Sequence, residues 1–331
     1  MIRIAINGFG RIGRSACKVA WGFPDVEIVA INDLAPADNL VYLLKHDTNY
    51  GAWNVEVAAK ENTLVIGSHV IPLFAEKDPS KLPWEKLQVD IALECTGLFL
   101  SEELAMSHIK AGARKVLLSA PAKEGDIPTY VRGVNCAGVG EDEHLILSNA
   151  SCTTNCVAPV TAVMEEAFGI EHAMLTTVHG YTASQALVDA PKKDWREGRA
   201  AAENMVPTTT GAAKAVAKTI PSLKGKFDGL SVRVPLSTVS LSDMVFVLKR
   251  PTTKEEVNAA LAHAAETERF KGILAVSKEL LVSSDYKGNA HSSTVDAELT
   301  MVVGGTLVKV VAWYDNEWGY ANRLVELARK M

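Results

Sequence analysis

The segment Gly8-Phe9-Gly10-Arg11-Ile12-Gly13 decides the fold of the first half of this chain. It follows the apolar run Ile2 to Ile6, which is typical of a buried strand, and it opens a stretch with apolar residues at helical spacing. A lone G-x-G-x-x-G pattern is weak evidence, but a strand before it and a helix after it are the context of a dinucleotide-binding loop. Gly8, Gly10 and Gly13 would let the backbone approach a pyrophosphate at the helix N-terminus.

An acidic residue follows at the distance expected for a dinucleotide site. The second strand-like run, Glu27 to Ile31, ends in Asn32-Asp33, about 20 residues beyond the last glycine. Asp33 can accept hydrogen bonds from an adenosine ribose, and its charge would repel a 2′-phosphate. The loop, its flanking elements and Asp33 therefore favour a site for NAD rather than NADP. The alternative is a glycine-rich turn that binds nothing.

Short apolar strands alternate with helical stretches through the first 150 residues, which predicts a Rossmann-type, doubly wound, mostly parallel sheet in an α/β fold. The predicted strands are Ile2–Asn7, Ile28–Asn32, Ile91–Cys95, Lys115–Ser119 and Leu145–Ser148. The predicted helices are Arg11–Trp21, Ala37–Leu44, Glu102–Ala111 and part of Pro128–Val131. Ligands in this architecture bind at the carboxyl ends of strands, so Thr96, Gly97 and Ser119 are candidate cofactor-pocket residues. Each of them alone is explained more simply as a turn residue.

The second half has a different pattern, in which longer strands are mixed with helices. The predicted strands are Leu230–Val234, Val239–Leu248, Leu299–Val303 and Leu307–Trp313. One helix has a visible start at Thr253 and Glu256, which have the spacing of a capping box. The pattern predicts an α+β catalytic domain with one broad mixed sheet.

The last helical segment predicts how the domains divide. Residues Tyr320–Met331 have helical apolar spacing and no strand after them, so we expect them to pack on the first domain. We therefore expect an NAD-binding domain at 1–150 together with the C-terminal helix 316–331, and a catalytic domain at 151–315.

One cysteine lies in a setting that favours reactivity. Residues 148–156 have the sequence SNASCTTNC, directly after the strand-like run Leu145–Leu147, and helical spacing begins at Val157. A strand-to-helix junction places free backbone N–H groups and the positive end of a helix dipole beside the Cys152 thiol. We expect these groups to lower the pKa of Cys152 and to offer hydrogen bonds to an oxyanion. The alternative is a small buried cysteine in a polar turn.

A reactive thiol needs a base or a cation nearby. Among eight histidines, His179 is the best candidate, because it ends a predicted strand and precedes a long polar segment. A structural role is the alternative for this histidine.

A second group of residues could bind anions. It comprises Arg196, Arg199, Thr208–Gly211 and Arg233. Threonine hydroxyls and backbone amides before a helix that starts near Ala212 suit phosphate, and arginine binds phosphate through two N–H groups. Helix capping is the alternative for residues 208–211. Arg233 lies in mid-strand, where an unpaired charge would be costly.

The composition is that of an ordinary globular protein. The 331 residues are 48% hydrophobic and 22% charged, and the formal net charge of −5 gives no electrostatic case for nucleic acid as a partner. We expect a cytoplasmic protein without a signal peptide or a membrane span, since no basic leader and no apolar run of about 20 residues occurs. The five cysteines are odd in number and scattered, so we expect neither a disulfide framework nor a metal site, and core packing for Cys156.

These motifs together closely resemble the phosphorylating glyceraldehyde-3-phosphate dehydrogenase family over essentially the whole chain. The resemblance rests on INGFGRIGR at 6–14, SNASCTTNC at 148–156, KDWREGRAAAENMVPTTTGAAKAV at 193–216, HSSTVDA at 291–297 and WYDNEWGY at 313–320. It implies glycolytic, NAD-dependent oxidation of D-glyceraldehyde 3-phosphate with inorganic phosphate to 1,3-bisphosphoglycerate. It also implies a homotetramer in which the loop after His179 reaches toward a neighbour's cofactor site.

The resemblance assigns roles to individual residues. Cys152 is the nucleophile, which forms a thiohemiacetal and then a thioester, and His179 is its base. The implied NAD contacts are Arg11, Ile12, Asp33, Lys77, Ser119 and Asn316. The implied substrate and phosphate contacts are Ser151, Thr153, Thr182, Arg196, Thr210, Gly211 and Arg233. Glu197 stands where some members place a second arginine, which leaves open whether Arg196 or Arg199 is the second anion contact.

Several alternatives compete with this interpretation. Erythrose-4-phosphate dehydrogenases share Ala321 but lack the pair Tyr181-Thr182, and a related semialdehyde dehydrogenase is a more distant possibility. A cysteine hydrolase would have no use for the glycine loop with Asp33. The intact Cys152 and His179 weigh against a catalytically silent binding protein.

Overall fold

The chain folds into two compact units in the computed structural model, which describes residues 1–331. The first unit comprises Met1–Tyr130, Ala137–Ala150 and Ala321–Met331, and the second comprises Val131–Cys136 and Ser151–Tyr320. Compared with the expected division, residues 131–136 belong to the second unit, and the C-terminal part of the first unit begins at Ala321 instead of residue 316. None of the helices has the length and apolar character that crossing a bilayer requires.

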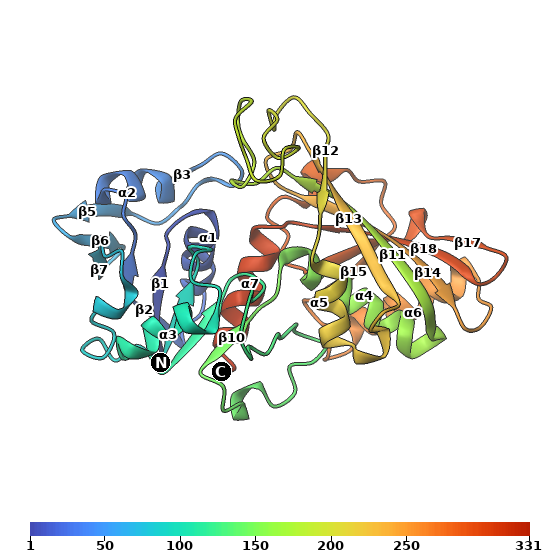
Figure 1. The fold of residues 1–331 in the computed structure, drawn as a ribbon, viewed down its shortest axis with the longest axis horizontal. Coiled ribbons are helices and arrows are strands. Elements are labelled where there is room, and N and C mark those ends of the chain that lie inside the picture. Colours follow the sequence, from blue (N-terminus) through green and yellow to red (C-terminus); the bar gives the residue numbers. More distant parts are fainter. The chain divides into compact units, whose positions relative to one another are not determined.

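An eight-stranded sheet organises the first unit, in the order β10-β9-β8-β1-β2-β7-β6-β5 (Figure 1). Its strands are β1 (Ile2–Asn7), β2 (Val26–Asn32), β5 (Val57–Lys60), β6 (Thr63–Ile66), β7 (His69–Phe74), β8 (Ile91–Glu94), β9 (Lys115–Leu118) and β10 (Ile146–Ser148). All neighbours from β10 to β7 are parallel, whereas β6 pairs antiparallel with both β7 and β5. The helices are α1 (Arg11–Ala20), α2 (Ala37–Lys45) and α3 (Glu102–Lys110), and a short pair of strands, β3 (His46–Asp47) and β4 (Gly51–Ala52), follows α2. The predicted Rossmann-type α/β architecture is confirmed.

The predicted elements of this unit are mostly present. All five predicted strands form, with ends that differ by at most two residues. The predicted helix at Pro128–Val131 is wrong, because Thr129 forms a parallel bridge to Ser148 and the Ser148 N–H donates to the Pro128 carbonyl at 3.0 Å. The strands β5, β6 and β7 were not predicted, although Gly67, at φ 57°, marks the turn between β6 and β7.

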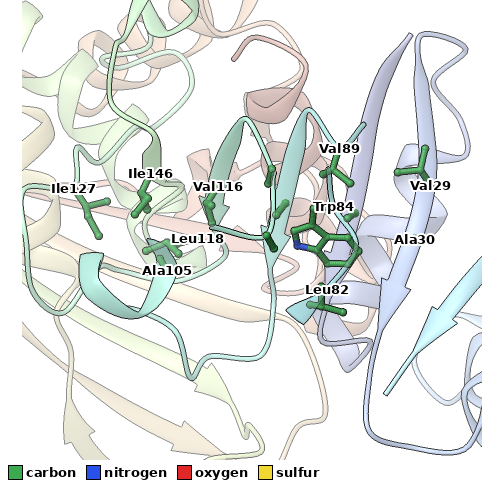
Figure 2. Packing of buried hydrophobic residues seen from close by; sticks show 14 residues of the cluster. Val29, Ala30, Leu82, Trp84, Val89, Ala105, Val116, Leu118, Ile127 and Ile146 are labelled. Carbon is green, nitrogen blue, oxygen red and sulfur yellow. The ribbon is translucent and has the colours of Figure 1, made fainter. Parts of the chain in front are cut away.

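A buried apolar cluster covers one face of this sheet. Strand residues such as Val29, Val116 and Leu118 contribute to it, and Trp84, which precedes β8, is fully buried within it. Figure 2 shows the Trp84 indole beside Leu82, with its nitrogen at one side of the ring. Truncating such a side chain to alanine costs about 3–5 kcal/mol, so Trp84 is a principal stabiliser of this unit.

The second unit contains a mixed sheet in the order β12-β13-β11-β14-β18-β16-β15, with β17 paired to β18. Its strands are β11 (Ile170–Gly180), β12 (Val206–Thr209), β13 (Phe227–Val234), β14 (Ser240–Leu248), β15 (Leu274–Ser277), β16 (Ser293–Asp296), β17 (Met301–Val303) and β18 (Leu307–Tyr314). The helices are α4 (Cys152–Phe168), α5 (Ala212–Thr219) and α6 (Lys254–Glu266). Helix α7 (Trp318–Ala328) begins in this unit and belongs to the first unit from Ala321 onward. The predicted α+β unit with one broad sheet is confirmed.

Two local predictions in this unit need correction. The predicted strand Leu299–Val303 begins only at Met301, because residues 297–299 form a 3₁₀ turn capped by the Asp296 carboxylate. The capping box of α6 is half formed: Thr253 Oγ1 accepts from the Glu256 N–H at 3.2 Å, but the Glu256 carboxylate accepts from the Thr252 hydroxyl at 2.8 Å.

Candidate functional site

The glycine loop lies between β1 and α1, and its three glycines have different reasons to lack a side chain. Gly8 has φ 90°, and a Cβ on Gly13 would come within 2.1 Å of the Gly8 carbonyl oxygen. These two glycines are therefore required by the fold itself. Gly10 has an ordinary φ of −69°, and a Cβ there would meet no atom within 4 Å. The space beside Gly10 is therefore left open rather than filled by the protein.

A cavity of about 520 Å³ opens at this loop, at the carboxyl ends of the parallel strands. It is lined by Asn7, Gly8, Gly10, Asn32, Asp33, Leu34, Glu76, Lys77, Cys95, Thr96, Leu98 and Phe99. The predicted residues Gly8, Gly10, Asp33, Lys77 and Thr96 are thus brought together. The open space at Gly10, the N-terminus of α1 and a carboxylate in one cavity fit the pyrophosphate and ribose of a dinucleotide.

Backbone N–H groups, one of them in the glycine loop, hold the Asp33 carboxylate in place. Its Oδ2 accepts from the Phe9 N–H at 2.7 Å, and its Oδ1 accepts from the Ala35 N–H at 2.9 Å. A carboxylate has about four acceptor positions, so two of them are left for ribose hydroxyls. The two backbone contacts hold the carboxylate in position before any ligand binds.

The other predicted cofactor residues lie outside the lining of this cavity. Arg11 forms an ion pair with Asp47 at 2.8 Å, and Ile12 and Gly13 continue α1. Gly97 follows Thr96 at φ 73°, and Ser119 follows β9. Asn316 is buried in the second unit, where its Oδ1 accepts from the Ser240 hydroxyl at 3.0 Å.

Cys152 is the first residue of α4, as the sequence predicts. Ser151 caps the helix, because its Oγ accepts from the Thr154 N–H at 3.1 Å. Ala150, just before the cap, has φ 56°, an uncommon conformation for a residue other than glycine. This tight strand-to-helix turn directs the partly exposed Cys152 toward the free amides of the first helical turn.

The structure brings Cys152, His179 and Arg233 into contact. Cys152 Sγ lies 3.5 Å from His179 Nε2, and Arg233 Nη1 lies 2.6 Å from His179 Nδ1. His179 and Arg233 are opposite each other in the parallel register of β11 and β13, which explains their proximity. The His179 Nδ1 atom is also 2.7 Å from the Gly180 carbonyl oxygen. Arg233 can only donate and the Gly180 oxygen can only accept, so Nδ1 satisfies one of these two neighbours at a time. When Nδ1 donates to Gly180, Nε2 is left unprotonated and faces the sulfur.

The electrostatics of this pair correct one expectation. Burial raises the pKa of the Cys152 thiol, and the Arg233 guanidinium and hydrogen bonds from Thr153 offset this effect only in part. Burial, assisted by Arg233, lowers the pKa of His179 to about 3. The predicted fall in the thiol pKa is therefore wrong. The helix N-terminus is present, but desolvation outweighs it, and the pair is a neutral thiol beside a neutral imidazole.

The predicted anion-binding residues fall into two groups. Ser151 and Thr153 adjoin Cys152, and Thr153 Oγ1 hydrogen-bonds to the Tyr314 hydroxyl at 2.9 Å. Thr182, Arg196, Thr210 and Gly211 lie on the segments between β11 and α5 and make no hydrogen bond to Cys152, His179 or Arg233. The helix predicted near Ala212 is confirmed as α5, and Thr210 Oγ1 accepts from the Ala212 N–H at 3.2 Å.

The strand register separates Arg233 from the predicted anion-binding residues near Thr210. Val206 of β12 is opposite Arg233, and Thr209 is opposite Leu230. Thr210 therefore lies about four residues from Arg233 along the sheet, roughly 13 Å at the rise of a strand. Arg233 has no carboxylate partner, and its Nε is buried without a hydrogen bond, so this guanidinium is available to an anion.

The two candidate arginines after His179 also differ. Arg199 donates to the Asp189 carboxylate at 3.1 Å, whereas the Arg196 side chain is exposed and has no carboxylate partner. This difference favours Arg196 as the second anion contact.

Sequence reasoning missed one residue beside the thiol. The hydroxyl of Tyr314, a residue of the motif WYDNEWGY, lies 2.9 Å from Thr153 Oγ1 and 2.9 Å from Thr177 Oγ1, and its ring packs edge-on against His179. Burial raises the pKa of this hydroxyl, so Tyr314 stays neutral and serves as a hydrogen-bonding support for the start of α4. Its place directly after the predicted strand Leu307–Trp313 was the available signal; the observed strand β18 extends to Tyr314 itself.

Comparisons with known proteins cover both units. Residues 2–102 match the family described as glyceraldehyde 3-phosphate dehydrogenase, NAD binding domain, and residues 151–316 match its C-terminal domain. The chain is 53% identical over 327 residues to glyceraldehyde-3-phosphate dehydrogenase of Geobacillus stearothermophilus, covering 99% of this chain and 97% of that protein. It is 52% identical over 327 residues to glyceraldehyde-3-phosphate dehydrogenase 1 of Bacillus subtilis, with the same coverage. It is 50% identical over 327 residues to glyceraldehyde-3-phosphate dehydrogenase of Streptomyces coelicolor, covering 98% of this chain and 97% of that protein.

Proposed function

The chain belongs to the glyceraldehyde-3-phosphate dehydrogenase family, and from this premise we propose how its own residues carry out the reaction. It is an NAD-dependent oxidoreductase of glycolysis that acts on glyceraldehyde 3-phosphate. The observation that carries the proposed mechanism is the contact of Cys152 with His179 and of His179 with Arg233. Residues 1–150 and 316–331 are proposed to serve NAD binding, and residues 151–315 catalysis.

The cofactor is proposed to occupy the cavity at the glycine loop. Gly8, Gly10 and the N-terminus of α1 would receive its pyrophosphate, and Asp33 would accept from its adenosine ribose. Further contacts are proposed for Arg11, Ile12, Gly13, Lys77, Thr96, Gly97, Ser119 and Asn316. When bound, NAD accepts a hydride at its nicotinamide ring.

The first chemical step is attack of Cys152 on the aldehyde. As the bond between sulfur and carbon forms, His179 Nε2 takes the thiol proton and the aldehyde oxygen gains the π electron pair. His179 then gives that proton to the oxygen, which completes the thiohemiacetal and leaves the imidazole neutral for the next step. A lowered pKa keeps His179 unprotonated at neutral pH, which supports its role as a general base. The free amides at the start of α4 are available to stabilise the developing oxyanion.

The remaining steps convert the thiohemiacetal to product. His179 removes the hydroxyl proton as the hydride leaves, and the carbonyl reforms as a thioester on Cys152. An oxygen of inorganic phosphate then attacks the thioester carbon, the bond to sulfur breaks, and 1,3-bisphosphoglycerate is released while the sulfur regains its proton from His179. Ser151, Thr153 and Arg233 are proposed for one anion subsite, and Thr182, Arg196, Thr210 and Gly211 for the other.

We also propose a cytoplasmic homotetramer. Four large apolar side chains are exposed on the segment after β11, namely Leu187, Val188, Trp195 and Met205. Several large apolar side chains exposed on one segment are typical of a surface that another subunit covers. Sedimentation of the purified protein would test the tetramer.

An absorbance assay at 340 nm tests the function. The protein should form NADH from NAD, phosphate and D-glyceraldehyde 3-phosphate, with lower efficiency on erythrose 4-phosphate and on semialdehydes. Turnover that does not require phosphate, or a clear preference for another aldehyde, would contradict the proposal.

Replacing Asp33 by alanine should weaken NAD binding by about 10- to 100-fold and leave NADP binding nearly unchanged, because the ribose contacts are lost together with the repulsion of the 2′-phosphate. The asparagine variant is the matched control, since it removes the charge but keeps an acceptor for the Phe9 N–H. Catalytic efficiencies with both cofactors measure the effect. A wild-type enzyme that uses NAD and NADP equally well would show that Asp33 does not select between the two cofactors.

Replacing Arg233 by alanine should slow the phosphate-dependent step, or raise the phosphate and substrate concentrations needed, by about 10- to 100-fold. NAD affinity should stay nearly unchanged, because Asp33 and the glycine loop belong to the first unit. Pre-steady-state kinetics separate the hydride burst from release of the acyl group, and calorimetry measures NAD binding. Arg269, which pairs with Glu166 at 2.8 Å on the surface, gives the control substitution Arg269→Ala. Loss of NAD binding with normal turnover at saturating cofactor would make Arg233 a structural cation.

A further inference from the structure

A fully buried carboxylate lies beneath the cavity of the first unit. Glu94 ends β8 and has no exposed surface. Its Oε2 accepts from Asn7 Nδ2 at 2.6 Å and faces His108 Nε2 at 3.1 Å, and its Oε1 accepts from the Thr96 N–H at 2.8 Å and from the Thr96 hydroxyl. Burying a carboxylate is costly unless its acceptor positions are satisfied, and here they are.

The contact with Trp84 determines which ring nitrogen of His108 carries the proton. The indole N–H of Trp84 can only donate, and it lies 3.1 Å from His108 Nδ1, so Nδ1 is the acceptor. The proton of a neutral His108 is therefore on Nε2, where it faces Glu94. All groups around Glu94 then donate to it, which suits the acceptor oxygens of a carboxylate. The pair is anchored in the apolar core by the indole shown in Figure 2.

This carboxylate connects the loops that line the cavity. Asn7, which it holds, is the last residue of β1 and accepts through Oδ1 from Asn32 Nδ2 at 2.7 Å. Asn32 in turn donates to the Glu76 carbonyl at 2.9 Å and accepts from the Glu76 N–H at 2.9 Å. On the other side, Glu94 holds Thr96, which packs so closely against Gly8 that a Cβ on Gly8 would lie 2.7 Å from the Thr96 backbone nitrogen. Asn7, Asn32, Glu76 and Thr96 all line the cavity.

We propose that Glu94 and His108 are positioning residues for NAD, since they fix the ends of β1, β2 and β8 and the segment after β7 in the arrangement that the dinucleotide fits. The proposal rests on the proposed use of this cavity by NAD. Neither residue lines the cavity, so their effect on the cofactor passes through Asn7, Asn32 and Thr96.

Replacing Glu94 by glutamine tests this role with almost no change of volume. A glutamine amide has an NH₂ group at one end, and each end of the Glu94 carboxylate faces only donors. At least one hydrogen bond is therefore lost and one N–H is left unpaired, whichever way the amide turns. We expect the dissociation constant of NAD to rise about 10- to 100-fold, with a matching rise in KM for NAD and kcat within about threefold at saturating NAD.

His108→Leu provides a second variant that removes one donor from Glu94 and leaves the other three. It should raise the dissociation constant of NAD by less, about three- to tenfold. The matched control is Asp142→Asn, because Asp142 is another carboxylate of the same unit that pairs with a histidine, His144 Nδ1 at 2.6 Å, and it does not line the cavity. This control should leave NAD affinity unchanged even where it lowers the unfolding temperature.

Calorimetry of NAD binding and thermal unfolding without NAD are measured for all four proteins. If Glu94→Gln lowers the unfolding temperature but binds NAD as the wild type does, the network only supports the fold and the proposal is overturned. If Glu94→Gln does not fold, His108→Leu decides, and wild-type affinity in that variant overturns the proposal. A wild-type protein that fails to bind NAD would instead overturn the proposed function.

Discussion

Replacing His179 by asparagine should lower the rate of the hydride burst by about 10²- to 10⁴-fold, the usual contribution of a positioned general base. The asparagine amide cannot accept the proton that His179 Nε2, 3.5 Å from Cys152 Sγ, is placed to take. Stopped-flow absorbance at 340 nm with saturating NAD and aldehyde measures the burst. His172→Asn is the control, since His172 is an exposed histidine of the same strand. A burst of wild-type rate in His179→Asn would exclude His179 as the base.

The same histidine makes stability depend on pH. Its pKa is lowered to about 3 by burial and Arg233, so the unfolded chain binds a proton at His179 that the folded chain does not. The stability that the neutral imidazole provides is complete above the unfolded pKa of about 6.5 and is lost as the pH falls from there toward 3. Denaturant unfolding of wild type and His179→Asn between pH 7 and pH 4 should show a shallower loss in the variant. Parallel curves would show that His179 is protonated equally in both states.

The raised pKa of Cys152 has a matching consequence for reactivity. The rate at which iodoacetamide alkylates Cys152 should increase with pH, and the pH at half-maximal rate should lie above the ordinary pKa of a thiol, because burial disfavours the thiolate.

Replacing Gly10 by alanine should produce a folded protein that binds NAD at least about 100-fold more weakly, because the new Cβ projects into space that the pyrophosphate would occupy. The same substitution at Gly13 should lower the free energy of unfolding by about 3 kcal/mol or more, since its Cβ would lie 2.1 Å from the Gly8 carbonyl oxygen. The change at Gly10 should cost no more than about 1 kcal/mol, the range of a weakened helix cap.

Chemical denaturation and calorimetry of the two variants make the comparison direct. Gly10→Ala should have a denaturation midpoint close to that of the wild type and bind NAD far more weakly, whereas Gly13→Ala should have a much lower midpoint. Unchanged NAD affinity in Gly10→Ala would show that the open space beside Gly10 is not part of the cofactor site.

The main architecture could be predicted because its signals are local. The glycine loop between a strand and a helix, the acid at Asp33 and the cysteine at the start of α4 each follow from spacing over a few residues. The strands β5 to β7 at one end of the sheet were missed because most of their residues are only partly buried, so they do not form continuous apolar runs. The helix predicted at Pro128–Val131 does not form because Thr129 pairs with Ser148, which is distant in sequence.

What the sequence could not provide is burial. The thiol of Cys152 was expected to ionise easily because the helix N-terminus is visible in the sequence, but the desolvation that outweighs it is a property of the folded unit. The burial of Glu94 and His108 could not be predicted from the sequence either. A glutamate at a strand end and a histidine on an amphipathic helix usually face solvent, and only the packing around Trp84 places both in the core.

The first unit is built from segments that are far apart in the sequence, and this affects the order in which it can fold during synthesis. Residues 321–331 belong to that unit and contribute Leu324, Val325, Leu327 and Ala328, all fully buried. The whole of residues 151–320 must leave the ribosome first, which takes on the order of ten seconds or more at the usual rates of translation. The first unit, although most of it is synthesised first, therefore cannot complete its buried core until its last helix has been made.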